Sequence, residues 1–226
     1  MKRLRRSLEA VVFDLDGLAV DSEPVHLEAW RRAMEEFGAE LDPSSIRPYF
    51  GRPVASTAAG LAGEFHLDQE RVLDARNRAF DELARRGLPP RPGLVEAVRT
   101  LRRSGLRCGL VTSGTREYAR AVLDTLQRDF GIEFDVVVTM DDVECPKPDP
   151  EPYLRAAELL DLDPSSCAVL EDAPAGVASA KAAGMAVVAV PNESTSGLDF
   201  SSADAEQSDV LNGVRWLLAT SDRSDN

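Results

Sequence analysis

Residues 10–17 read Ala-Val-Val-Phe-Asp-Leu-Asp-Gly, an apolar run that ends in two aspartates and a glycine. A short run of branched and aromatic residues that ends at glycine predicts a buried strand. Because side chains alternate along a strand, Asp14 and Asp16 would lie on one side and Leu15 on the other. Two carboxylates in one site repel each other unless a cation or a shared proton intervenes. The run therefore indicates a metal site or two acids with separate roles, although acids after a strand also simply face solvent.

A second predicted strand, residues 106–111, is followed by polar residues that suit a bound phosphate. Thr112 and Ser113 offer hydroxyl groups, and the loop at Gly114 offers backbone amides. Because the end of a strand cannot be placed to one residue from sequence, Ser113 is the close alternative to Thr112. The same residues would also serve as an ordinary helix cap.

Two further segments supply a cation and two more acids. Lys147 lies in the loop 145–150, Cys-Pro-Lys-Pro-Asp-Pro, whose prolines stiffen the chain around the charge. Residues 167–170 predict another buried strand, and Glu171 and Asp172 follow it directly. Taken singly, a surface lysine and acids at a helix N-terminus are the simpler interpretations. Together with Asp14, these groups are the ones that phosphoryl transfer to an aspartate requires.

The four segments all fall at the carboxyl ends of predicted strands in an alternating strand and helix pattern. In an open parallel sheet those ends converge on the crevice where ligands bind. At residues 14–22 and 170–185 the chain resembles the haloacid dehalogenase superfamily of phosphotransferases, and more narrowly its β-phosphoglucomutase-like branch. The resemblance spans roughly residues 8–190. It implies an α/β fold, a Rossmann-like parallel sheet core with an inserted small α-helical cap domain.

The insertion is visible in the spacing of the motifs. Roughly 90 residues separate Asp16 from Thr112, whereas a crossover between parallel strands needs only one helix. We expect a core of residues 1–19 and 88–226 and a cap of residues 20–87, which would close over the site. Helical spacing and caps predict cap helices at 22–38, 43–47, 54–64 and 68–87.

Beyond the insertion the alternation of strands and helices resumes. The expected helices are 93–104, 116–130, 151–160, 174–183 and 209–219, and the further strands are 134–138 and 186–190. Both tryptophans, Trp30 and Trp216, are predicted to lie in the core rather than to contact a ligand.

The resemblance implies a role for each core residue. Asp14 would attack phosphorus and form an aspartyl-phosphate, and Asp16 would protonate the leaving oxygen and then take a proton from water. Thr112 would hydrogen-bond a transferring oxygen, with Ser113 and Gly114 beside it on the substrate. Lys147 would neutralise charge on the phosphate.

A metal ion is also implied, because a phosphate dianion cannot approach several carboxylates unaided. Mg²⁺ prefers hard oxygen ligands, and Asp14, the backbone carbonyl of Asp16, and Asp172 would supply them. Glu171 is either a further ligand or a group that holds a metal-bound water.

Residues of the predicted cap would select the substrate. His26 matches a position where β-phosphoglucomutase-like proteins carry a histidine that assists sugar transfer, although a lone histidine on such a helix is also commonly structural. Gly51 and Arg52 lie on a loop that resembles the family's substrate-facing cap loop, where the arginine could hold a second anion. Arg76 stands where a mutase would use lysine, and this departure favours water over a sugar hydroxyl as the acceptor.

Composition excludes several classes of partner. The net charge of −13 argues against nucleic acid or an anionic membrane surface. Three cysteines without C-x-x-C spacing indicate reduced thiols, and the basic start is not followed by the apolar h-region of a secretory leader, so we expect a cytoplasmic protein. We also expect a monomer. The predicted function is a Mg²⁺-dependent phosphatase of small phosphorylated metabolites, such as sugar phosphates. The alternatives are a sugar phosphomutase, a 2-haloacid dehalogenase and a catalytically silent binding module.

Overall fold

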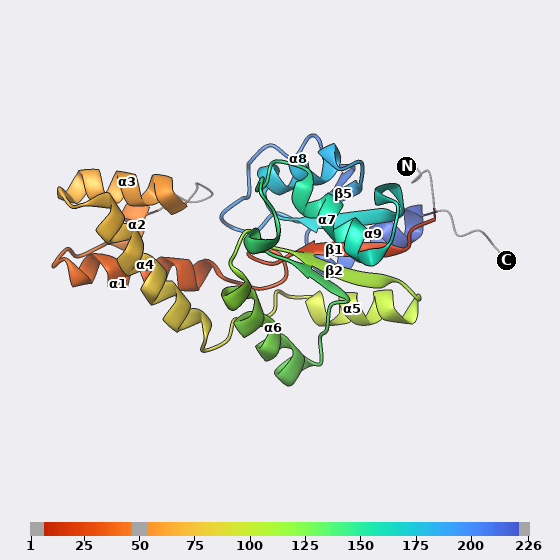
Figure 1. Cartoon of the computed structure of the whole chain (residues 1–226), viewed down its shortest axis with the longest axis horizontal. Helices are drawn as coiled ribbons and strands as arrows, with labels where there is room; N and C mark the ends of the chain where they lie inside the picture. The colour runs from red at the N-terminus through yellow and green to blue at the C-terminus, as the bar shows by residue number, and fades with distance from the viewer. Residues whose placement is uncertain (1–6, 47–53, 222–226) are drawn as a thin grey trace. The chain divides into compact units, whose positions relative to one another are not determined.

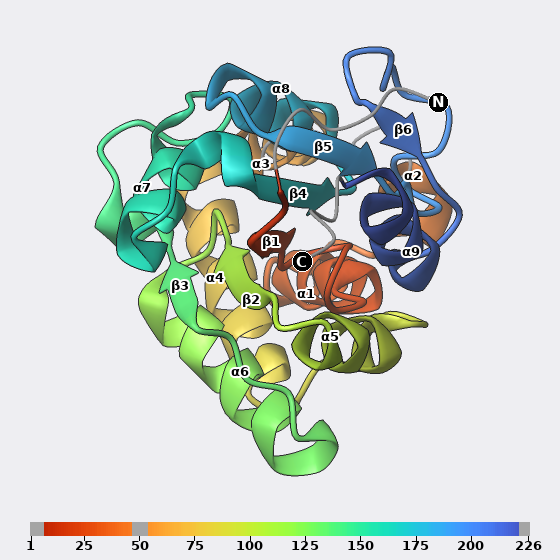
Figure 2. The ribbon, with the colours of Figure 1, turned by 90° about the vertical axis from the view of Figure 1, so that its right-hand side faces the viewer.

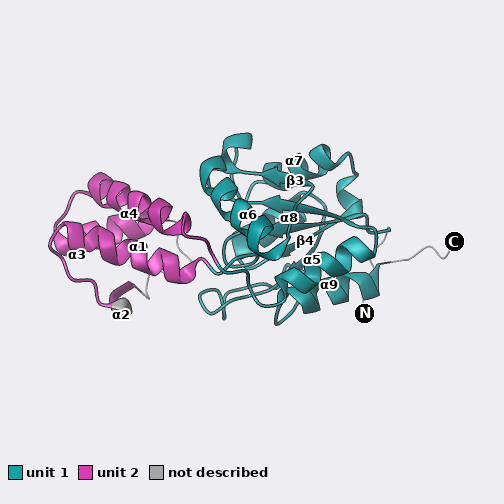
Figure 3. Cartoon of the chain, turned by 90° about the horizontal axis from the view of Figure 1, so that it is seen from below, with its two compact units in different colours: residues 1–21, 89–226 teal, residues 22–88 magenta. Residues whose placement is uncertain are grey.

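The computed structural model describes residues 7–46 and 54–221 and divides the chain into two compact units (Figure 3). Unit 1 comprises residues 1–21 and 89–226, and unit 2 comprises residues 22–88. These limits lie one and two residues from the boundaries that the motif spacing predicts. Within the described ranges, no helix has both the length and the apolar character that a membrane crossing requires.

Unit 1 is built on a six-stranded parallel sheet in the order β3-β2-β1-β4-β5-β6. The sheet confirms the predicted α/β fold. Its strands are β1 (Ala10–Asp14), β2 (Arg107–Val111), β3 (Val136–Val138), β4 (Cys167–Glu171), β5 (Ala186–Ala189) and β6 (Ala205–Glu206).

Strand β1 lies at the centre of the sheet, and all five of its residues are buried. Phe13 is in register with Leu110 of β2 and with Leu170 of β4. Because the three strands are parallel and end at the same level, the residues that follow them meet at one edge of the sheet. This register brings the segments after residues 14, 111 and 171 together.

Helices cover both faces of this sheet. They are α5 (Leu94–Arg103), α6 (Arg116–Phe130), α7 (Glu151–Leu160), α8 (Pro174–Ala182) and α9 (Val210–Thr220), shown in chain order in Figure 1. Figure 2 shows α7 and α8 on one face of the sheet and α5 and α9 on the other. Alternating residues such as Val12 and Val169 pack with Tyr153 in the core beneath α7 and α8. Burial of such side chains from water is the main force that holds the layers together.

Unit 2 is helical, with α1 (Glu23–Glu36), α2 (Pro43–Ile46), α3 (Val54–Phe65) and α4 (Gln69–Ala84). The predicted cap of α4 is present, because the Asp68 carboxylate accepts a hydrogen bond of 2.9 Å from the backbone N–H of Arg71. Trp30, Met34 and Leu61 are buried in the core of this unit.

Three local expectations differ from the structure. Strand β6 was not expected, because two residues, Ala205 and Glu206, carry no alternating apolar pattern. Helices α1 and α4 end at Glu36 and Ala84, two and three residues before the glycines taken as their limits. Trp216 is only half-buried on α9 rather than part of the core.

Candidate active site

Asp14 is the last residue of β1, and only 7% of its surface is exposed. The chain then turns sharply, with the N–H of Gly17 donating to the carbonyl of Val20. Gly17 has a φ of +83°, and a Cβ at this position would lie 2.3 Å from Oδ2 of Asp172. Glycine is therefore required both by the backbone conformation and by the approach of a site carboxylate.

Lys147 places its ammonium group between two carboxylates. Its Nζ lies 2.5 Å from Oδ1 of Asp14 and 2.7 Å from Oε1 of Glu171, and its side chain is 8% exposed. The ring of Tyr153 lies beneath the same ammonium, 5.0 Å from its centroid. The lysine of the proline-rich loop is therefore not a surface residue but a fixed cation inside the site.

Glu171 is held on both of its oxygens. Its Oε1 accepts from Lys147 and, at 2.6 Å, from the hydroxyl of Tyr153. Its Oε2 accepts from the backbone N–H groups of Asp172 and Ala173 at 3.1 and 3.2 Å. A Cβ on Gly176 would lie 1.7 Å from Oε1 of Glu171, so this glycine of α8 leaves the space that the carboxylate fills.

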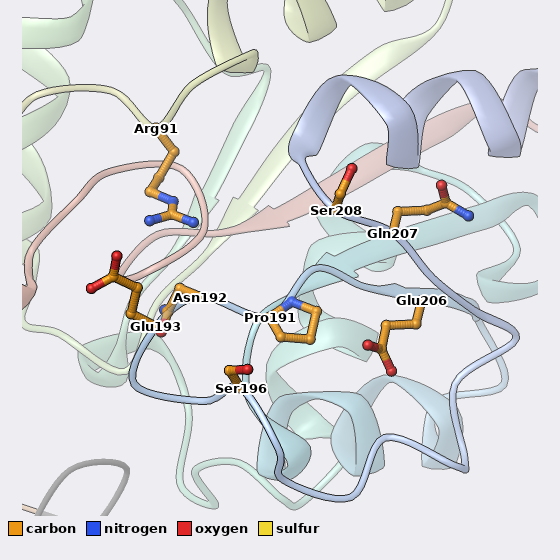
Figure 4. Close-up of a pocket in the computed structure, with 8 residues that line it drawn as sticks. All are labelled: Arg91, Pro191, Asn192, Glu193, Ser196, Glu206, Gln207 and Ser208. Carbon is orange, nitrogen blue, oxygen red and sulfur yellow. The ribbon is translucent and has the colours of Figure 1, made fainter.

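Asp172 is oriented by a residue of the loop after β5. Asn192 donates from Nδ2 to Oδ2 of Asp172 at 2.7 Å and to the carbonyl of Gly17 at 3.3 Å. Its own side-chain oxygen accepts from the backbone N–H groups of Ser194 and Thr195, which fixes the amide orientation. Figure 4 shows Asn192 on this loop, where it also lines an open pocket of about 540 Å³.

Asp16 lies two residues beyond Asp14 and is half-buried. Thr112 donates from Oγ1 to Oδ2 of Asp16 at 3.3 Å and accepts from the N–H of Gly114 at 2.9 Å. The structure thus brings Thr112 to Asp16, while Ser113 beside it is exposed. The hydroxyl of Tyr118, in the first turn of α6, donates to Oδ1 of Asp16 at 2.5 Å.

Burial and crowding of like charges dominate the electrostatics. Burial raises the pKa of Asp14 from 3.8 to about 8, even though Lys147 acts in the opposite direction. Burial and the carboxylates of Asp14 and Glu171 also raise the pKa of Asp172 well above its usual range. Although burial opposes the charge, the two adjacent carboxylates raise the pKa of Lys147. The three buried carboxyl groups of Asp14, Glu171 and Asp172 therefore outnumber the single ammonium group of Lys147 that lies between them.

This donor set fits a hard divalent cation. One oxygen from each of Asp14, Glu171 and Asp172 lies within 4.8 Å of the others, and all three residues are buried. A ligand set of carboxylate oxygens, without sulfur or imidazole, suits Mg²⁺ better than softer metals such as copper or zinc. A cation at this position would also offset the unfavourable clustering of carboxylates that raises their pKa values.

In unit 2 the structure brings His26 and Arg76 together, a contact that their positions in the sequence do not indicate. Nη2 of Arg76 is hydrogen-bonded to Nδ1 of His26. The guanidinium lies 4.4 Å from the Phe80 ring centroid, and His26 stacks on the same ring at 4.5 Å. Burial and the arginine charge lower the pKa of His26 to about 3. The other two residues predicted to select the substrate from the cap, Gly51 and Arg52, lie outside the described residues.

Three residues that contact the predicted site were missed by sequence reasoning: Tyr118, Tyr153 and Asn192. Both tyrosines lie in the first turn of the helix after a motif loop, a position that reads as ordinary helix core. Asn192 follows β5 as the other polar groups follow their strands, so the same rule applied to β5 would have found it.

Comparison with known proteins extends these observations. Residues 11–190 match the family model described as haloacid dehalogenase-like hydrolase. The chain is 35% identical over 215 residues to validoxylamine A 7'-phosphate phosphatase of Streptomyces hygroscopicus subsp. limoneus, covering 92% of this chain and 96% of that protein. It is 35% identical over 185 residues to a phosphorylated carbohydrates phosphatase of Thermotoga maritima, covering 79% and 82%.

A solved structure shows the same arrangement of elements. The crystal structure of a Thermotoga maritima protein, provisionally named a beta-phosphoglucomutase, matches with a TM-score of 0.73 at 31% identity. The match covers 94% of this chain and 99% of that one. With the family model spanning most of the chain, this agreement confirms the resemblance on which the site residues were chosen. The chain belongs to the haloacid dehalogenase-like hydrolase family, in its β-phosphoglucomutase-like branch.

Proposed function

We propose that this protein is a Mg²⁺-dependent phosphatase of small phosphorylated metabolites, with sugar phosphates as its main substrate class. The observation that carries the proposal is the buried Asp14 carboxylate, held by Lys147 at 2.5 Å beside the further carboxylates of Glu171 and Asp172. An ordinary structural ion pair would not need three buried acids around one lysine, because such clustering is costly. The names of the two phosphatases above support the substrate class.

In the proposed reaction Asp14 attacks phosphorus and becomes an aspartyl-phosphate, while Asp16 gives a proton to the leaving oxygen. Asp16 then takes a proton from the water that attacks the phosphorylated Asp14. Lys147 balances the charge of the transferring group, and Thr112 orients one of its oxygens, with Ser113 and Gly114 offering further donors.

Mg²⁺, held by Asp14, Asp172 and the backbone carbonyl of Asp16, would supply the positive charge that lets a phosphate dianion enter this acidic site. Both oxygens of Glu171 already accept hydrogen bonds, two of them from Lys147 and Tyr153. We therefore propose that Glu171 mainly positions Lys147 and holds a metal-bound water rather than binding the metal directly.

The acceptor is proposed to be water rather than a sugar hydroxyl. A phosphomutase would need its cap to bind and orient a second sugar, and His26 would assist the transfer. Here His26 is hydrogen-bonded to Arg76, and its pKa of about 3 leaves it neutral at physiological pH. We propose that His26, Arg76, Gly51 and Arg52 select the substrate rather than take part in proton transfer.

A panel of phosphorylated metabolites tests this function. Phosphate release is measured with and without Mg²⁺, with and without a sugar bisphosphate, and with Asp14→Asn as the matched inactive control. We expect Mg²⁺-dependent release without any bisphosphate, and loss of several orders of magnitude in the variant. Rapid interconversion of sugar 1- and 6-phosphates with little free phosphate would identify a mutase instead, and no turnover of any phosphoester would identify a silent module.

A further inference from the structure

The hydroxyl of Tyr118 contacts the carboxylate of Asp16, which performs both proton transfers in the proposed reaction. It donates to Oδ1 of Asp16 at 2.5 Å, from the first turn of α6, and Tyr118 is only 6% exposed. We propose that Tyr118 is a positioning residue, which holds the Asp16 carboxylate in the orientation that proton transfer needs. This inference rests on the proposed function and adds to it a residue that the sequence motifs did not include.

The two oxygens of Asp16 are held by donors from different parts of the fold. Tyr118 reaches Oδ1 from α6, and Thr112 reaches Oδ2 from the end of β2. A carboxylate on a loop rotates about two side-chain torsions, and a single donor would leave one rotation open. Two donors on separate rigid elements fix the plane of the carboxylate, which is the preorganisation that a catalytic group requires.

The ring of Tyr118 is itself fixed by the backbone at Gly114, in the segment that follows β2. A Cβ on Gly114 would lie 2.5 Å from Cδ1 and 3.1 Å from Cε1 of Tyr118. The ring therefore packs directly on the glycine, and the side chain of Thr115 caps the same helix turn by accepting from the Tyr118 N–H at 3.3 Å. The absence of a side chain at residue 114 is what lets the phenol reach Asp16.

The two donors hold the carboxylate while Asp16 performs both proton transfers. Asp16 gives a proton to the leaving oxygen as the bond from phosphorus to that oxygen breaks. In the second half Asp16 takes a proton from the water that attacks phosphorus, and the bond between Asp14 and phosphorus breaks. Tyr118 keeps its own proton throughout.

Tyr118→Phe tests the inference because it removes only the hydroxyl. Its matched control is Tyr153→Phe, which removes a second buried hydroxyl that contacts Glu171 and not Asp16. For each variant, kcat/KM is measured on an alkyl phosphate and on an activated aryl phosphate, whose leaving group needs no protonation. We expect Tyr118→Phe to lose about tenfold or more on the alkyl phosphate and less than about threefold on the aryl phosphate, within the range of general acid catalysis. Tyr153→Phe should affect both substrates equally.

A double-variant comparison separates positioning from general structural damage. When Asp16 is already replaced by asparagine, Tyr118→Phe should cause no further loss on the alkyl phosphate, because the group that it positions is gone. Thermal unfolding of each variant shows that the fold is retained. Equal losses on both substrates, or the same loss with and without the Asp16 carboxylate, would overturn the positioning role. Failure of the wild-type protein to hydrolyse any phosphoester would instead overturn the proposed function.

Discussion

Replacement of Lys147 by methionine should destabilise unit 1 far more than loss of an ordinary ion pair. Methionine is an unbranched apolar side chain of similar size, but it removes the ammonium that lies 2.5 Å from Asp14 and 2.7 Å from Glu171. Both carboxylates are buried, so solvent cannot replace the lost charge. Removing one partner of a buried pair costs about 3–5 kcal/mol.

The control is Lys181→Met. Lys181 pairs with Asp204 at 2.8 Å, but its side chain is 35% exposed. Pairs at such positions contribute about 0.2–1 kcal/mol, because water stabilises each charge in its absence. The two variants therefore remove the same kind of residue from pairs of similar length, and they differ in burial.

The assay is denaturant unfolding of both variants in excess chelator, from pH 6 to pH 9. Because Lys147 lowers the pKa of Asp14, which is about 8 in the intact protein, its removal raises that pKa further. Folded Lys147→Met then holds a proton that the folded wild type has released, so its stability falls more steeply as the pH rises through 8. A loss no larger than that of Lys181→Met, or a gap that does not widen with pH, would refute the buried-cation account.

Three further predictions concern single contacts. Asn192→Ala removes the hydrogen bond to Asp172, a ligand of the proposed Mg²⁺ ion, and should weaken Mg²⁺ binding, measured by titration calorimetry, about 10- to 100-fold. For His26, the folded pKa of about 3 lies below the unfolded value of 6.5, so stability falls as pH decreases, by at most about 2 kcal/mol between pH 7 and pH 5. This fall should be smaller in His26→Gln, and equal slopes would contradict the assignment. Gly176→Ala should displace Glu171 and lower turnover at least about tenfold, whereas Gly63→Ala, with open space around it, should not.

The acids and Thr112 of the candidate site could be chosen from the sequence because each lies at the end of a short buried strand or directly after it. The apolar run at residues 10–13 predicts a buried strand, and the structure has that strand as β1, with Asp14 as its last residue. Lys147 could be chosen from its stiff loop, but its exact partners could not. Those partners depend on the register of β1 and β4, which brings residues 14 and 171 to the same edge.

Contacts between side chains far apart in the chain could not be predicted from the sequence. Tyr118 lies 102 residues from Asp16 and meets it only because α6 begins above the end of β2. His26 and Arg76 are 50 residues apart on α1 and α4, and their spacing along each helix shows nothing of their pairing. Strand β6 could not be predicted because its two residues show no periodicity, and it is defined only by its pairing with β5.

The most direct test of the account is chemical trapping of the proposed intermediate. The protein is mixed with a sugar phosphate and Mg²⁺, quenched during turnover and treated with borohydride, which reduces an acyl phosphate to the alcohol and so converts the modified aspartate to homoserine. Peptide mass spectrometry then locates the reduced residue. The account predicts homoserine at position 14, only with substrate and Mg²⁺ present. Turnover without any reduced residue at position 14, or with reduction at another aspartate, would contradict it.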